Sequence, residues 1–284
     1  MTENRYEILA PVGRLEDMED IIAAGADAVY VGLAGFSSRP KSSDLNVEEI
    51  RCGIELAHRK HVAVYVAVNA CINENQMEEL EACLCELNEA EVDSVILADY
   101  GLIHFYAEMN NHRPIHASTL LGAYNCATID WLAKEGVTRI VLSTNLYLDE
   151  INDIIRRSSS SMEYEIVAEG GLCYNCNRGC RLPHLGEKEG YRVFCQEKYE
   201  LHIGEQVQKA YHRIGHRTIH LGPMMGMYMA IGIGSYKIEG RTSPKQTIVK
   251  RVHHMKQCRD YFLQMNDELD SLPHYVCREW RRRD

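Results

Sequence analysis

The sequence has 284 residues, a hydrophobic share of 45% and a formal net charge of −10 at pH 7. This size and composition can bury a large core, which excludes a disordered chain. Neither an apolar stretch long enough to cross a membrane nor the apolar segment of a signal peptide is present, so we expect a cytoplasmic protein without a membrane span. The acidic balance argues against a broad nucleic-acid surface, so nucleic acid is not expected as a partner.

Short apolar runs alternate with amphipathic stretches along the chain, a rhythm typical of βαβ units with parallel strands. The predicted strands cover residues 6–10, 28–31, 62–68, 94–98, 114–117, 138–142, 162–168 and 235–238. The predicted helices cover residues 15–24, 46–58, 76–90, 100–109, 125–135, 148–157 and 246–267. This order predicts an α/β fold, a (β/α)8 TIM-like barrel. An open doubly wound sheet is the alternative, but Pro11-Val12-Gly13 lacks the glycine pattern that such sheets use for dinucleotides.

The rhythm breaks between residues 170 and 230, which we interpret as a cysteine-rich insertion near the barrel mouth. Within it, residues 205–213 form a charged stretch that we expect to be helical. The chain is interpreted as a single barrel domain over residues 1–284, in which residues 246–284 form a C-terminal helical cover.

Four cysteines and their glycine neighbours are the most distinctive feature of this insertion. Cys173, Cys176, Cys180 and Cys195 follow the spacing C-x2-C-x3-C-x14-C. Four thiolates at such spacing can hold an iron–sulfur cluster or a tetrahedral zinc ion, and the spacing does not decide between the two. Ordinary core packing of free cysteines is the structural alternative.

In a (β/α)8 barrel the chemistry lies at the C-terminal ends of the strands, so polar residues there are the candidates for a site. The candidates for moving protons are Glu239, Asp99 and His116. The candidates for binding a carboxylate-bearing ligand are Arg39, Asn69, Ser118, Lys237 and Arg241. Each has a structural alternative: Asp99 and Asn69 can cap helices, and Lys237 and Glu239 can form structural ion pairs.

Four motifs in order along the chain resemble the peptidase U32 (collagenase-like) family. The segment EILAPVG is followed by AGADAVYVG, and the segment IHAST by Asn125. The glycine- and cysteine-rich segment from Gly171 to Cys180 resembles the family's G-x-x-C-x6-C signature. The segment SYKIEGRTSP resembles its closing S-x-K-I-E-G-R…SP motif. The resemblance spans residues 6–262.

The resemblance implies a barrel that carries an oxygen-sensitive 4Fe–4S cluster on four cysteines. It also implies oxygen-independent hydroxylation, in anaerobic ubiquinone synthesis or on RNA bases, with prephenate as the hydroxyl donor. Cys173, Cys180 and Cys195 match the family's cysteines. The segment 221–225, which often provides a fourth ligand in the family, contains no cysteine here, and Cys176 is our substitute.

The sequence therefore predicts an iron–sulfur-dependent, oxygen-independent hydroxylase or related redox enzyme for a small or aromatic substrate that carries a carboxylate. One alternative is a non-catalytic or electron-relaying subunit that pairs with a second U32-type subunit. Another is the peptidase activity of the family's historical name, for which the sequence offers neither a Ser-His-Asp arrangement nor an H-E-x-x-H motif.

Overall fold

The computed structural model describes residues 6–39, 43–172, 199–212 and 217–265. Eight parallel strands form a closed barrel in these residues, because β6 pairs with β7 in addition to the order β7-β11-β1-β2-β3-β4-β5-β6. The barrel strands are β1 (Glu7–Pro11), β2 (Ala28–Gly32), β3 (Ala63–Val68), β4 (Ser94–Leu97), β5 (Ile115–Ala117), β6 (Val137–Val141), β7 (Glu163–Leu172) and β11 (Ser235–Ile238). The predicted (β/α)8 barrel is confirmed.

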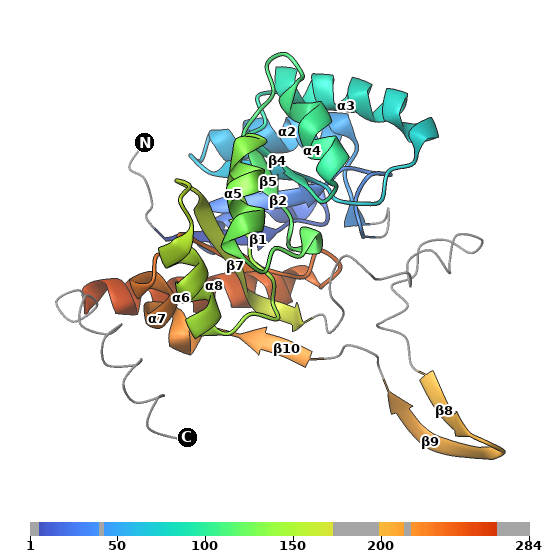
Figure 1. The fold of residues 1–284 in the computed structure, drawn as a ribbon, viewed down its shortest axis with the longest axis vertical. Helices are drawn as coiled ribbons and strands as arrows, with labels where there is room; N and C mark the ends of the chain where they lie inside the picture. The colour runs from blue at the N-terminus through green and yellow to red at the C-terminus, as the bar shows by residue number, and fades with distance from the viewer. Residues whose placement is uncertain (1–5, 40–42, 173–198, 213–216, 266–284) are drawn as a thin grey trace.

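Helices surround the barrel, as Figure 1 shows. They are α1 (Met18–Ala23), α2 (Val47–His58), α3 (Met77–Glu89), α4 (Tyr100–Ala107), α5 (Cys126–Lys134), α6 (Leu148–Arg157), α7 (Met225–Ala230) and α8 (Lys245–Gln264). The sequence specifies their starts locally. The side chain of Asn46, for example, accepts a hydrogen bond from the Glu49 amide, and Glu49 accepts one in return from the Asn46 amide. Within the described ranges, no helix is sufficiently long and apolar to cross a membrane.

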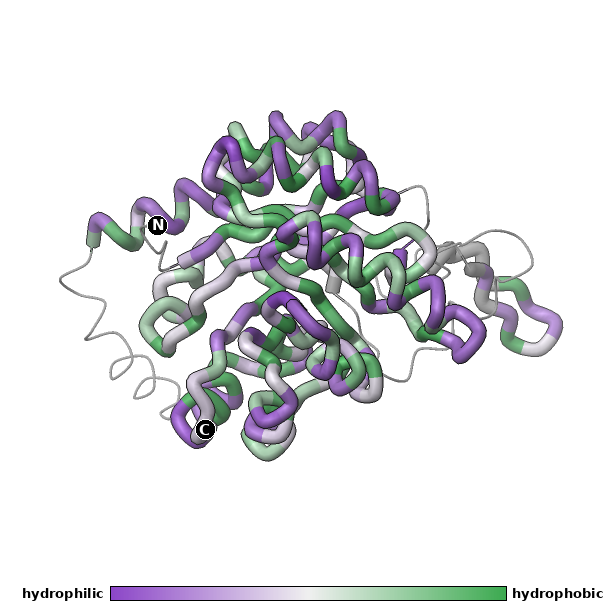
Figure 2. Tube along the Cα trace, turned by 90° about the horizontal axis from the view of Figure 1, so that it is seen from above, coloured by the Kyte–Doolittle hydropathy of each residue, from purple (hydrophilic) through white to green (hydrophobic). Residues whose placement is uncertain are grey.

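The core consists of two layers because successive strand residues point to opposite sides. In β3, Val64, Val66 and Val68 belong to the layer between strands and helices. Tyr65 and Ala67 instead belong to a smaller cluster inside the barrel. Figure 2 shows the helices alternating between hydrophobic and hydrophilic residues, as expected where one side of each helix packs on the barrel. Side chains inside the barrel therefore come from alternate residues of each strand.

The stretch around residues 205–213 differs from its prediction. Residues 199–212 form an antiparallel hairpin of β8 (Tyr199–Ile203) and β9 (Gln206–His212), so the expected helix is wrong. Its two-residue turn contains Gly204 with a φ of 61°, a conformation that glycine adopts readily and that a helix does not use. The next strand, β10 (Arg217–His220), pairs antiparallel with the end of β7 and leads to α7.

Candidate active site

The segment after β11 carries three predicted site residues to the C-terminal end of the barrel. Lys237 and Glu239 are two residues apart, so both side chains face the interior, with Glu239 nearer the mouth. Arg241 follows in the loop toward α8. Each of the three side chains contacts an oppositely charged side chain from another strand or loop.

Arg39 and Glu239 form an ion pair across the mouth. The Arg39 Nη2 atom lies 2.5 Å from Glu239 Oε1, and the two side chains remain 29% and 23% exposed. The other carboxylate oxygen of Glu239 accepts a hydrogen bond from the Gly171 amide at 3.0 Å. This pair joins the loop after β2 to the ends of β7 and β11. Because both side chains are partly exposed, a ligand at the mouth can reach them.

Arg241 pairs with Asp44 below this surface. Its Nη1 atom lies 2.7 Å from Asp44 Oδ1 and its Nη2 atom 2.8 Å from Ser37 Oγ, and the ion-paired side chains are 3% and 1% exposed. Burial raises the pKa of Asp44 to about 6, although the Arg241 charge acts to lower it. Because both charges are enclosed, this pair fixes the loop before α2 rather than binding a free ligand.

Lys237 points into the barrel. Its Nζ atom donates a hydrogen bond to Glu165 Oε1 at 3.1 Å and lies 4.3 Å from the centre of the Tyr30 ring. Burial lowers the pKa of Lys237, while the Glu165 carboxylate acts to raise it. Burial also raises the pKa of the Tyr30 hydroxyl, which donates to the Ile238 carbonyl. Lys237 is therefore an enclosed amine beneath the mouth.

Glu165, Glu7 and Arg139 belong to this interior network but were absent from the sequence prediction. Arg139 Nη1 lies 2.6 Å from Glu7 Oε1 and 3.4 Å from Glu165 Oε2. The Glu165 side chain is 1% exposed. The alternating residues Glu163, Tyr164 and Glu165 of β7 are compatible with a strand that has one face in solvent. Closure of the barrel turns the face with Glu165 inward, and the sequence of β7 alone does not reveal this closure.

Three other predicted site residues bond the backbone. Asp99 caps α4 by accepting from the Leu102 amide at 3.0 Å. Asn69 accepts from the Ser38 amide at 3.0 Å, and Ser118 from the Leu120 amide at 3.2 Å. Asn69 thus supports the loop that carries Arg39, whereas Asp99 and Ser118 shape the loops after β4 and β5.

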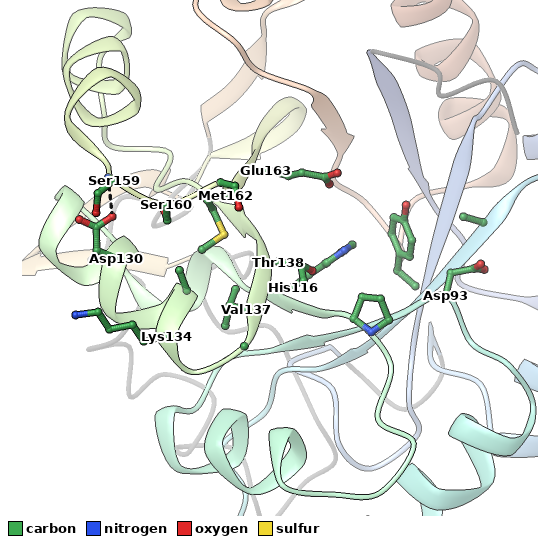
Figure 3. Close-up of a pocket in the computed structure, with 16 residues that line it drawn as sticks. Asp93, His116, Asp130, Lys134, Val137, Thr138, Ser159, Ser160, Met162 and Glu163 are labelled. Atoms are coloured by element: carbon green, nitrogen blue, oxygen red, sulfur yellow. Dashed lines mark hydrogen bonds between the residues drawn. The ribbon is translucent and has the colours of Figure 1, made fainter.

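His116 lies apart from Arg39, Glu239 and Arg241. It faces the barrel interior against Tyr65, with ring centres 4.7 Å apart, and its Nδ1 atom has no hydrogen-bond partner. It lines a pocket of 1010 Å³ formed by the N-terminal ends of β3 to β7, shown in Figure 3. Burial lowers the pKa of His116 well below its ordinary value. The structure therefore places this histidine toward the end of the barrel opposite the mouth.

The predicted metal ligands Cys173, Cys176, Cys180 and Cys195 lie outside the described residues. In the described portions of the chain, no group of three or more His, Cys, Asp or Glu side chains could hold a metal ion. The chemistry of the predicted donor set, four thiolates, fits a 4Fe–4S cluster. The described part of β7 ends at Leu172, directly before this set and beside Glu239.

Residues 13–282 match the model of peptidase family U32. The "tRNA hydroxylation protein P" of Escherichia coli is 31% identical over 81% of this chain and 51% of its own length. The "23S rRNA 5-hydroxycytidine C2501 synthase" of the same organism is 27% identical over 95% of this chain and 41% of its own length. The chain thus spans about half, or less, of the length of these relatives. The solved structure described as "The Structure of the U32 Peptidase Mk0906" aligns with a TM-score of 0.50 at 15% identity, over 61% of this chain and 72% of that one, and supports the fold alone.

These relatives correct the expectation about partners. The expectation of a small carboxylate-bearing substrate without nucleic acid is wrong, because the two Escherichia coli relatives are named for tRNA hydroxylation and for synthesis of 5-hydroxycytidine in 23S rRNA. The formal charge of −10 is a sum over the whole chain. Binding of phosphates depends on the local arrangement of cations, which such a sum does not describe.

Proposed function

Because this chain belongs to peptidase family U32, we propose that it forms the catalytic barrel of an enzyme that hydroxylates RNA bases. The observation that carries this proposal is its similarity, over 81% and 95% of its length, to relatives named for tRNA and 23S rRNA hydroxylation. The charged network at the barrel mouth supports it. The end of a (β/α)8 barrel at which enzymes of this fold act is also the end where Arg39 and Glu239 meet.

We assign the 4Fe–4S cluster of this enzyme to Cys173, Cys176, Cys180 and Cys195. When bound, such a cluster supplies one-electron transfer. The free cysteines of the described residues are Cys52, Cys71, Cys83, Cys85, Cys126 and Cys258, and they form no alternative metal site there.

At the mouth, Arg39 binds an anionic group of the RNA or of the hydroxyl donor. Arg39 is paired with Glu239, and both side chains are partly exposed, so an incoming anion can replace the Glu239 carboxylate. Glu239, released from Arg39 and still held by the Gly171 amide, is then free to take up a proton from the reacting base. Prephenate, which the family resemblance implies, is the hydroxyl donor to test first.

The test is hydroxylation by the chain purified without oxygen. The protein is incubated with transcripts of tRNA and of a 23S rRNA segment, with and without prephenate. Nucleosides are then analysed by mass spectrometry for an added oxygen atom, and iron and acid-labile sulfide are measured on the same preparation.

We expect a hydroxylated pyrimidine in one of the RNAs, and iron and sulfide contents that both fall in Cys176→Ala. Cys52→Ala is the matched control, because Cys52 is an exposed free cysteine of α2. Protein with full iron and sulfide that leaves every RNA unmodified would refute the function, and full iron retained in Cys176→Ala would refute that ligand.

A further inference from the structure

A line of hydrogen-bonded side chains crosses the barrel interior below the mouth. The Tyr65 hydroxyl donates to Glu7 Oε2 at 2.6 Å. The Ser235 Oγ atom lies 2.9 Å from Glu7 Oε1 and 3.1 Å from Glu165 Oε2. Lys237 Nζ donates to the other oxygen of Glu165 at 3.1 Å. Every link is within hydrogen-bonding distance, so the line is continuous from Tyr65 to Lys237.

Ser235 lies between the two carboxyl groups of this line. A serine hydroxyl has one proton to donate, yet its oxygen is close to two carboxyl groups. The second contact is favourable when that carboxyl group is protonated and donates to Ser235 Oγ. Both carboxyl groups also contact cations: Glu7 and Glu165 contact Arg139, and Glu165 contacts Lys237.

The two ends of the line face different parts of the molecule. At the lower end, Tyr65 and Glu163 line the pocket on the N-terminal side of the barrel, shown in Figure 3. At the upper end, Lys237 of β11 lies two residues before Glu239, which follows the strand directly, a spacing of about 7 Å along the chain. A short chain of waters or a ligand group can span such a gap.

We propose that Glu7, Ser235, Glu165 and Lys237 form a proton relay between the reaction site at the mouth and the pocket on the opposite face. The relay rests on the proposed function, because the base carbon that gains a hydroxyl group releases its hydrogen as a proton, while the hydroxyl donor retains the electron pair of the bond it loses. The proton shared through Ser235 first leaves by Glu7 to solvent, and Lys237 replaces it on Glu165. The neutral Lys237 amine then takes the proton from Glu239 and returns that carboxylate to its ionised form. Each transfer breaks one bond to hydrogen and forms another, without change in oxidation state.

The surroundings of Lys237 suit this exchange. Burial lowers the pKa of its amine, and the Glu165 carboxylate opposes that change. A lysine whose neutral form is accessible can both accept and release a proton. The charged and titratable groups that face it are Glu165 from β7, Tyr30 from β2, Arg139 from β6, His116 from β5 and Arg241 from the loop after β11.

Infrared spectroscopy of protein labelled with isotopic glutamate tests the shared proton without any RNA. Wild type is expected to show a protonated carboxyl band near neutral pH that shifts in heavy water. The band is lost in Glu165→Gln and altered in Ser235→Ala. Ser94→Ala is the matched control, because Ser94 is a fully buried barrel serine whose hydroxyl has no partner. Absence of the band in wild type would overturn the proposal, whether or not RNA is hydroxylated.

The rate of RNA hydroxylation as a function of pH tests the relay itself. Ser235→Ala is expected to lower the rate at least about 10-fold and to move the pH optimum, since general acid–base steps contribute about 100-fold or more. Ser235→Thr keeps a hydroxyl group and is expected to restore both, while Ser94→Ala leaves both unchanged. An unchanged pH profile in Ser235→Ala would exclude a relay through this residue. A wild-type enzyme that shows the band but modifies no RNA would refute the proposed function and leave the proton line in place.

Discussion

Arg241 and Asp44 form an ion pair that the surrounding loops exclude from solvent, with side chains 3% and 1% exposed. Arg241→Ala leaves the Asp44 carboxylate buried without its counter-charge. We expect the free energy of unfolding to fall by about 3–5 kcal/mol near neutral pH, measured by urea denaturation. Lys245→Ala is the control, because Lys245 pairs with Asp20 at an exposed position, so this substitution should leave stability nearly unchanged.

The stability lost in Arg241→Ala should depend on pH. Burial raises the pKa of Asp44 to about 6, and removing Arg241 raises it further. A carboxyl group whose pKa is raised by folding stabilises the fold at low pH and loses that contribution as the pH rises through the folded pKa. The variant should therefore lose less stability near pH 5 than near pH 7.5, because Asp44 is protonated at the lower value. An equal loss at both pH values would mean that Asp44 does not change its protonation between them, which would contradict its raised pKa.

Arg39 differs from Arg241 in its exposure, 29% for its side chain. Arg39→Ala should change stability by less than about 1 kcal/mol, because partly exposed pairs contribute little. RNA hydroxylation should instead fall about 10- to 100-fold, the value of one hydrogen bond to a charged group. Steady-state kinetics with both substrates measures this loss. Arg113, 32% exposed and placed before β5 at the other end of the barrel, is the control, and equal activity of the two variants would remove Arg39 from the site.

At the scale of residues, the sequence predicted that Arg39, Glu239 and Arg241 lie at one barrel end, and the structure places them there. Their roles in the chemistry stay predictions. It anticipated ion pairs of Lys237 and Glu239 but not the partners Glu165 and Asp44, because these two come from another strand and another loop. Ion pairs between segments far apart in the sequence form because the barrel closes. The local sequence around each residue does not reveal them.

At the scale of elements, the end of β7 packs closely on the segment after β11. Gly170 has a φ of 126°, and a Cβ atom there would lie 2.7 Å from the Glu239 carbonyl oxygen. Gly170→Ala should therefore push these segments apart and displace Glu239. Gly35 has a φ of 89° with open space around it. Gly35→Ala therefore places a side chain in an unfavourable backbone conformation but creates no steric clash.

We expect Gly35→Ala to cost about 1 kcal/mol of unfolding free energy and Gly170→Ala at least about 1 kcal/mol more. Thermal and urea unfolding of both variants measure the difference. Only Gly170→Ala should also lower RNA hydroxylation. Equal stability of the two variants would show that the close approach to Glu239 does not constrain the barrel.

The elements themselves were largely predictable, since apolar runs and helix caps are local signals. Asn46 and Asp99 begin α2 and α4 as their residue types indicate. The hairpin of residues 199–212 was not predictable from charge pattern alone, because alternating polar residues suit a helix surface and an exposed strand equally. Gly204 at its turn was the available signal.

At the scale of the whole molecule, the fold followed from the repeated βαβ order, while the partner did not. A net charge of −10 led to the exclusion of nucleic acid, and relatives named for RNA hydroxylation overturned it. Parallel strands with short connections restrict the topology strongly. Substrate choice depends on a few surface groups, and neither composition nor fold determines it.

The central claim is that this chain modifies RNA at the C-terminal mouth of its barrel. The most direct measurement is RNA hydroxylation by wild type, Glu239→Gln and Lys134→Ala, each with full iron and sulfide content, by nucleoside mass spectrometry. Lys134 lines the pocket at the opposite end of the barrel and serves as the control. We predict that wild type and Lys134→Ala modify the RNA equally, and that Glu239→Gln is about 100-fold slower or more. Full activity of Glu239→Gln, or loss of activity in Lys134→Ala alone, would contradict the claim.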